Sequence, residues 1–214
     1  MVDYSSDEER FSAIVDFFKR NRNSFLLIFL VIFSMLVIVI GFRSYQANQN
    51  AQASELYDLW LLEMSNENID SEKTVSTFNS LQEKFSKTGY AQLARMNRGS
   101  KSARDGDLDV SLGDFEELLQ TSSGLFGNNV LNSLARISIA RIELNNENYE
   151  KVLEVLDGFN SDSEHPIVYE IKGDALIGLD KKELALDQYS LAMTNMQDES
   201  QKSLLKIKIN KVSQ

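Results

Sequence analysis

The chain of 214 residues has no cysteine, one proline and one histidine. Without cysteine it can form no disulfide, no thiolate nucleophile and no cysteine-ligated zinc site. With a single proline, Pro166, and ten glycines, little in the chain interrupts a helix. No stretch alternates apolar and polar residues for long enough to predict a strand. These absences predict an all-α protein.

The motifs of common catalytic sites are also missing. The single histidine, His165, stands beside Pro166 in a polar segment that is typical of a loop. There is no glycine-rich phosphate loop, no HExxH zinc motif and no EF-hand loop, and the carboxylates are scattered as on a solvated surface. We therefore expect no enzyme activity, no catalytic residue, no cofactor and no metal site.

The negative charge of the chain is unevenly distributed. Residues 1–43 carry five basic and five acidic side chains, so the whole net charge of −10 falls on the residues that follow them. Nucleic-acid binding requires positive charge that neutralises phosphates, so this acidic part excludes it. Solubility is the simplest role of such an acidic surface.

A long apolar run stands out in this otherwise polar chain. Residues 25–42 contain no charge, and only Ser34 and Gly41 lie outside the strongly apolar set. As a helix the run is roughly 27 Å long, close to the hydrocarbon thickness of a bilayer. A buried core helix would need apolar surroundings that the chain does not supply. A cleaved signal peptide would need a nearer cleavage site than the small residues Ala51 and Ala53. We predict one uncleaved transmembrane helix over residues 24–43.

Basic residues predict the orientation of this helix. Lys19, Arg20 and Arg22 stand directly before the run, whereas after Arg43 there is no lysine or arginine until Lys73. Positive charge stays on the cytoplasmic side, so the N-terminus is expected in the cytoplasm and the later residues outside it. The expected organisation is a cytoplasmic tail (1–23), the span (24–43), membrane-proximal helices (44–88) and a repeat domain (89–214).

The tail contains a second helical pattern. Phe11, Ile14, Val15 and Phe18 recur at helical spacing and predict a short amphipathic helix. Two interpretations stay open. The helix lies on the membrane as a lead-in to the span, or it docks a membrane or cytosolic partner such as a signalling protein.

The last part of the chain contains repeats of about 34 residues, whose equivalent positions are 41 and then 33 residues apart. Counting Pro166 as position 1, small residues occupy positions 8, 20 and 27, where two helices of a hairpin approach closely, and large residues occupy positions 11 and 24. Two earlier, more degenerate copies precede it, and a C-terminal helix around Leu204–Ile209 caps the stack. The residues at the repeat positions, in chain order, are Gly99, Ala103, Leu108, Ser111 and Phe115; Ala140, Leu144, Tyr149, Val152 and Leu156; and Gly173, Leu176, Ala185, Tyr189 and Ala192.

Stacked helical hairpins bind peptides or partner helices in a groove lined by the first helix of each hairpin. The mixture of apolar and charged residues at the groove positions suits an adaptable binder. The predicted groove residues are Leu93, Met96, Ser100, Ile137, Arg141, Leu144, Glu170, Asp174 and Ile177.

Short blocks along nearly the whole chain resemble the ancillary SecYEG translocon subunit family, the YfgM type with a tetratricopeptide-like periplasmic domain. The blocks are residues 16–19 (Asp-Phe-Phe-Lys), 41–43 (Gly-Phe-Arg) with Tyr45, 90–94 (Tyr-Ala-Gln-Leu-Ala), 173–176 (Gly-Asp-Ala-Leu) and 208–210 (Lys-Ile-Asn). The first repeat departs from the family pattern at Arg95 and Arg98, which affects the shape of its groove.

The resemblance implies a single-pass protein of the bacterial inner membrane with its C-terminal domain in the periplasm. Its implied partners are the SecYEG translocon, a PpiD-type membrane-anchored chaperone and secreted polypeptides, and it brings no catalytic residue. Two alternatives stay open: a tail that regulates a signalling protein, and a scaffold for cell-envelope assembly.

Overall fold

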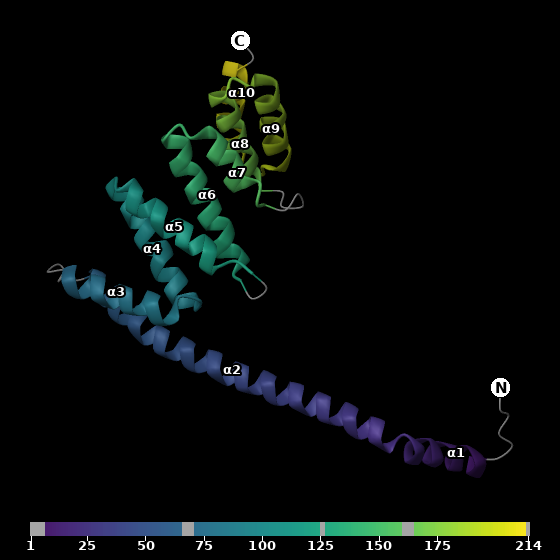
Figure 1. The fold of residues 1–214 in the computed structure, drawn as a ribbon. Coiled ribbons are helices and arrows are strands. Elements are labelled where there is room, and N and C mark those ends of the chain that lie inside the picture. Colours follow the sequence, from purple (N-terminus) through teal and green to yellow (C-terminus); the bar gives the residue numbers. More distant parts are fainter. Residues whose placement is uncertain (1–6, 66–70, 125–126, 160–164, 213–214) are drawn as a thin grey trace. The chain divides into compact units, whose positions relative to one another are not determined.

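The computed structural model describes residues 7–65, 71–124, 127–159 and 165–212. These residues form helices joined by turns and contain no strand, which confirms the all-α prediction (Figure 1). The chain divides into two compact units, Met1–Gln52 and Ala53–Gln214.

The first unit contains α1 (Asp7–Arg20) and the first part of α2 (Arg22–Ser65). Among the described residues, α2 is the one helix that is long and apolar enough to cross a membrane, and no side chain of its apolar window is buried. Its N-terminal region is apolar on every face, so the helix has no polar stripe along which to face water.

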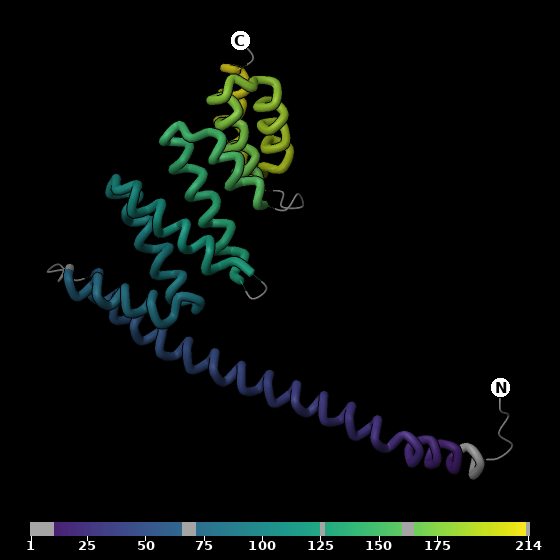
Figure 2. The backbone as a smooth tube through the Cα atoms, in the orientation of Figure 1, coloured from purple at the N-terminus to yellow at the C-terminus, as the bar shows by residue number. Residues whose placement is uncertain are grey.

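The second unit begins within α2 and continues with α3 (Ser71–Phe85). Three helical hairpins follow, and each helix packs on the next along the chain (Figure 2). The first helices of successive hairpins also touch, which stacks the hairpins. The hairpins are α4 (Gly89–Asp105) with α5 (Leu108–Thr121), α6 (Asn129–Asn145) with α7 (Tyr149–Leu156), and α8 (Pro166–Gly178) with α9 (Lys182–Asn195); α10 (Glu199–Val212) packs on the last of them.

The three hairpins turn in the same way. In each turn a backbone amide donates to the carbonyl five residues earlier at 2.9 Å: Asp107 to Ser102, Asn148 to Glu143 and Lys181 to Leu176. This bond marks a Schellman motif, in which the preceding residue takes a left-handed conformation. That residue is Gly106 (φ 87°), Glu147 (φ 60°) and Asp180 (φ 58°) in turn. Only the first turn uses the residue that adopts this conformation without steric cost.

The small and large repeat positions pack as predicted. A Cβ atom on Gly173 would lie 2.4 Å from the ring of Tyr189, so the close approach of α8 and α9 requires glycine there. Ala140, Ala185 and Ala192 are fully buried. Gly178 ends α8, and its missing Cβ makes room for the ring of Tyr149 from the preceding hairpin.

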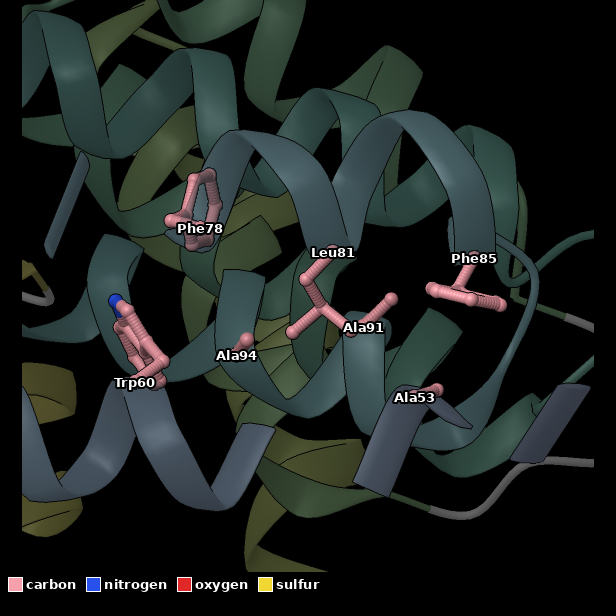
Figure 3. Packing of buried hydrophobic residues seen from close by; sticks show 7 residues of the cluster. All are labelled: Ala53, Trp60, Phe78, Leu81, Phe85, Ala91 and Ala94. Atoms are coloured by element: carbon pink, nitrogen blue, oxygen red, sulfur yellow. The ribbon is translucent and has the colours of Figure 1, made fainter. Parts of the chain in front are cut away.

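The hydrophobic core of the described residues is a series of four clusters, each of which joins three successive helices. The first cluster joins the end of α2 to α3 and α4 and centres on Trp60, Phe78 and Leu81 (Figure 3). Trp60 and Leu81 are almost completely buried. The C-terminal part of α2 from Ala53 is therefore built into the core of the second unit.

Candidate functional site

The predicted groove residues all lie on the first helices of the three hairpins. Leu93, Met96 and Ser100 are on α4, and the remaining residues are on α6 and α8. Because α4 touches α6 and α6 touches α8, the structure brings these three helices together in one layer. The six residues on α6 and α8 are Ile137, Arg141, Leu144, Glu170, Asp174 and Ile177.

Most of the apolar groove candidates are partly buried and pack against the hydrophobic core. Met96 packs on the cluster of α5 and α6, Ile137 and Leu144 pack on the cluster of α6 to α8, and Ile177 packs on the last cluster. Leu93 is 38% exposed, and Arg141 is exposed as well. These two side chains are the groove candidates most accessible to a partner.

The acidic groove candidates, Glu170 and Asp174, form ion pairs with a lysine of the last helix of the chain. Lys208 Nζ on α10 lies 2.7 Å from Glu170 Oε1 and 2.7 Å from Asp174 Oδ2. The hydroxyl of Tyr189 donates to Asp174 Oδ1 at 2.8 Å. A partner that approached Glu170 or Asp174 would therefore compete with Lys208.

This arrangement shifts the pKa values of Lys208 and Tyr189. Burial by itself lowers the pKa of Lys208, but hydrogen bonds and the charges of Asp174 and Glu170 outweigh it and raise the pKa. Burial, together with the hydrogen bond to Asp174, strongly raises the pKa of the Tyr189 phenol. At neutral pH the cluster therefore holds a charged lysine and a neutral tyrosine.

The first hairpin contains a different polar cluster, around Asp114 on α5. This carboxylate is 1% exposed and accepts two bonds from Arg98, at 2.7 Å from Nε and 2.6 Å from Nη2. Arg95 Nη1 also donates to Asp114 at 3.3 Å, and Arg95 Nε donates to Gln82. The guanidinium of Arg98 lies 3.7 Å from the ring centre of Phe78 on α3. The cluster therefore fastens α3, α4 and α5 together.

Arg95 and Arg98 are departures from the family pattern, and their partner Asp114 was not predicted from the sequence. The spacing of the residues in the sequence indicates the pair of Arg98 and Asp114. Positions 98 and 114 are equidistant from Gly106, and residues placed symmetrically about a hairpin turn face each other across the two helices. An acidic residue opposite an arginine at this spacing predicts the pair.

A recess of about 240 Å³ lies beside this cluster, between α2, α3 and α4. Its walls are apolar, and its two cations are already matched, since Arg98 pairs with Asp114 and Lys101 pairs with Asp105. The recess can accommodate an apolar group, but it offers an anion no unmatched charge. Its lining residues are Trp60, Met64, Thr74, Val75, Phe78, Arg98 and Lys101.

Side chains that could bind a metal ion are dispersed over the parts of the chain that the structure describes. No group of three or more histidine, aspartate or glutamate side chains there is placed to hold a metal ion. His165 is exposed directly before α8, and its side chain makes no capping bond to the helix. Tyr149 and Tyr189 pack against Gly178 and Gly173, so their rings fill hairpin contacts.

Stacked helical hairpins that follow one long apolar helix in the sequence define a helical-repeat protein of the kind that binds other proteins. Comparison with protein families matches residues 16–214 to the tetratricopeptide repeat-like domain family. The chain belongs to this family. The matched residues begin within α1 and include the apolar helix α2 as well as the hairpins. Comparisons with curated proteins and with solved structures found no match.

Proposed function

We propose that the chain is a non-enzymatic, single-pass scaffold of the bacterial inner membrane, with its repeat domain in the periplasm beside the SecYEG translocon. There it binds partner proteins or secreted polypeptides and links export to a PpiD-type periplasmic chaperone. Residues 1–23 lie in the cytoplasm, 24–43 in the bilayer, 44–88 next to the membrane and 89–214 in the repeat domain.

The observation that carries this proposal is the exposure of the apolar run of α2. Fifteen consecutive residues, 26–40, are exposed, and the large apolar ones among them have exposed fractions from 42% to 69%. Water-exposed apolar surface of this extent is strongly unfavourable, whereas a bilayer covers it completely. The basic residues Lys19, Arg20 and Arg22 before the run favour a cytoplasmic N-terminus.

The partner-binding role is supported by the repeat fold. The specific partners rest on the resemblance to the translocon subunit family. The acidic character of the second unit adds an argument for its location, because a negatively charged domain is repelled by anionic headgroups and stays free to meet soluble chains.

Site-specific photo-crosslinking in living cells tests the partner. The structure favours Leu93 and Arg141 as crosslinker positions over the half-buried groove candidates, with the exposed Glu116 on α5 as a matched control. We expect adducts with translocon subunits, the PpiD-type chaperone or a secreted chain from Leu93 and Arg141, and not from Glu116. Their absence, or equal yields from the control position, would contradict the proposal.

The absence of cysteine allows a separate test of orientation. A membrane-impermeant maleimide applied to intact spheroplasts should label Ser190→Cys on α9 and spare Ser12→Cys on α1, with both labelled after lysis. The reverse pattern would place the repeat domain in the cytoplasm. Recovery of the full-length chain from the cytosol without detergent would remove the membrane anchor altogether.

A further inference from the structure

The helix α1 presents a continuous apolar face to its surroundings. Phe11, Ile14 and Phe18 recur at helical spacing and are 69%, 54% and 52% exposed. Asp16 lies on the other side of the helix: at a rotation of about 100° per residue it stands about 160° around the axis from both Ile14 and Phe18. An exposed apolar stripe on a helix whose opposite side is polar indicates that the stripe is covered by another apolar surface.

The position of α1 in the chain indicates which surface that is. The helix ends at Arg20, α2 begins at Arg22, and the apolar run of α2 begins at Phe25. Five residues of helix rise about 7.5 Å, so the last turn of α1 lies at headgroup depth whenever α2 spans a bilayer. The rings of Phe18 and Phe25 lie 4.7 Å apart between centroids, and the ring of Phe17 packs on both. The apolar surface of α1 thus continues directly into that of α2.

The junction between the two helices contains an elbow. Asn21 belongs to neither helix, and its side-chain amide donates to the carbonyl oxygen of Phe17 at 2.9 Å. The backbone amide of Asn21 donates to the same carbonyl at 3.0 Å, and a polar side chain that bonds to the carbonyl four residues earlier often bends a helix. The elbow allows α1 to follow the membrane plane while α2 crosses the bilayer.

The charges at the elbow match a phospholipid surface. Lys19, Arg20 and Arg22 surround Asn21; Lys19 and Arg20 are exposed, and Arg22 is too. Interfacial helices combine an apolar stripe with basic residues that meet anionic headgroups. A protein partner would need neither the ring contact with Phe25 nor three basic residues at the junction next to the bilayer, where Arg10 is the one further basic residue of α1.

We propose that α1 is an interfacial helix that lies in the headgroup region of the bilayer spanned by α2, with its apolar stripe toward the acyl chains and its basic end on anionic phospholipid headgroups. This inference rests on the proposed membrane anchorage of α2. The lipid contact gives the anchor a second attachment, so the cytoplasmic tail is held flat on the membrane.

Single-cysteine variants of the full chain, labelled with the environment-sensitive fluorophore NBD, test the helix position. The chain is reconstituted in vesicles of phosphatidylcholine and phosphatidylglycerol in equal amounts. We expect the label at Ile14→Cys to emit in the blue and resist iodide quenching, while the label at Asp16→Cys stays accessible. A label at Val31→Cys, inside the apolar run, reports the anchor independently.

The outcomes separate the two proposals. An accessible label at both Ile14→Cys and Asp16→Cys with a protected label at Val31→Cys overturns the interfacial helix and leaves the anchor intact. An accessible label at Val31→Cys overturns the anchor. If the Ile14→Cys label is accessible in vesicles and becomes protected only when cytosolic extract is added, α1 docks a protein and the lipid proposal is wrong.

The headgroup contact has its own test. In the Ile14→Cys background, Lys19→Gln and Arg20→Gln should each lower the protected-to-accessible ratio of the label about fivefold in the mixed vesicles. Arg43→Gln, at the opposite end of the apolar run, is the matched control and should leave the ratio unchanged. Equal protection in vesicles of phosphatidylcholine alone, together with no effect of either substitution, overturns the contact with anionic lipid.

Discussion

The first and third hairpins of the repeat domain share a backbone plan but are held together differently. In the third hairpin, α8 and α9 meet where Gly173 leaves room for the ring of Tyr189, at 2.4 Å from the place of a Cβ atom. In the first hairpin, the equivalent Gly99 is less tightly covered, with its nearest neighbours at 3.1 and 3.3 Å. There the buried carboxylate of Asp114 and its two arginines join the helices.

The two hairpins therefore respond to different perturbations. Close packing of two helices is disrupted by a single added methyl group, whereas a buried ion pair is disrupted when one of its charges is removed. The ionic hairpin is also the one that fastens the repeats to α3 through Phe78. The following substitutions separate the two cases.

The largest effect is expected from Asp114→Ala. The change leaves Arg95 and Arg98 without their buried counter-charge, and breaking such a pair from one side costs about 3–5 kcal/mol of unfolding free energy. Urea unfolding of the detergent-solubilised chain, followed by far-ultraviolet circular dichroism, measures the loss. Glu116→Ala, an exposed position on the same helix, should change stability by less than about 0.5 kcal/mol. An equal loss in both variants would contradict a special role for Asp114.

A smaller loss is expected from Gly173→Ala in the third hairpin. The added methyl group must displace the Tyr189 ring, and overpacking of this kind costs about 1–3 kcal/mol. The matched control, Gly113→Ala, lies in α5 with no atom within 4 Å of the added Cβ atom, so it should stabilise the helix by about 0.5–1 kcal/mol. The same unfolding assay would contradict the packing argument if both substitutions changed stability in the same direction.

Tyr189→Phe removes the hydroxyl and keeps the ring. At neutral pH the lost hydrogen bond to Asp174 should cost about 0.5–1.5 kcal/mol. The pKa of Tyr189 is raised in the folded chain, so its contribution is complete below the ordinary pKa of 10 and is lost as pH rises above that value. Unfolding above pH 10 should therefore reduce the difference between the wild type and the variant. A difference that stays constant with pH would contradict the raised pKa.

The smallest effect is expected from Lys208→Met, which removes the ion pairs of α10 with α8. The lysine side chain is 38% exposed, so solvent screens these pairs and the loss should be about 0.2–1 kcal/mol. The loss should diminish in high salt. Lys151→Met, which breaks the exposed pair with Glu154, should be close to neutral. Equal losses from the two substitutions would show that the Lys208 pairs add nothing to an ordinary surface pair.

Much of the fold was predictable because the helices and hairpins depend on the residue pattern within short segments. The hairpins follow from small and large residues at the repeat positions. Pro166, counted as the first repeat position, begins α8 because its fixed φ and missing amide suit a first helical turn. The groove was harder to predict. Position numbers place Met96, Ile137 and Leu144 on the correct helices, but they do not show how far neighbouring helices cover them.

The polar clusters were not predictable from local pattern. Asp114 and Arg98 are 16 residues apart in the chain, and Lys208 reaches Glu170 across 38 residues. Contacts of this range depend on how the hairpins stack, and periodicity within one helix contains no information about them. Lys208 lies within the block of residues 208–210, which carries the family resemblance but predicts no contact for the lysine.

Amino-acid order alone determined the helical class of this protein, its repeated hairpins and its single uncharged apolar helix, because each depends on the periodicity or composition of a short segment. Tertiary structure decided which of its charges are buried and matched, and which predicted groove residues remain open to a partner. Those features depend on the distances between side chains from separate helices, and such distances exist only once the helices have packed.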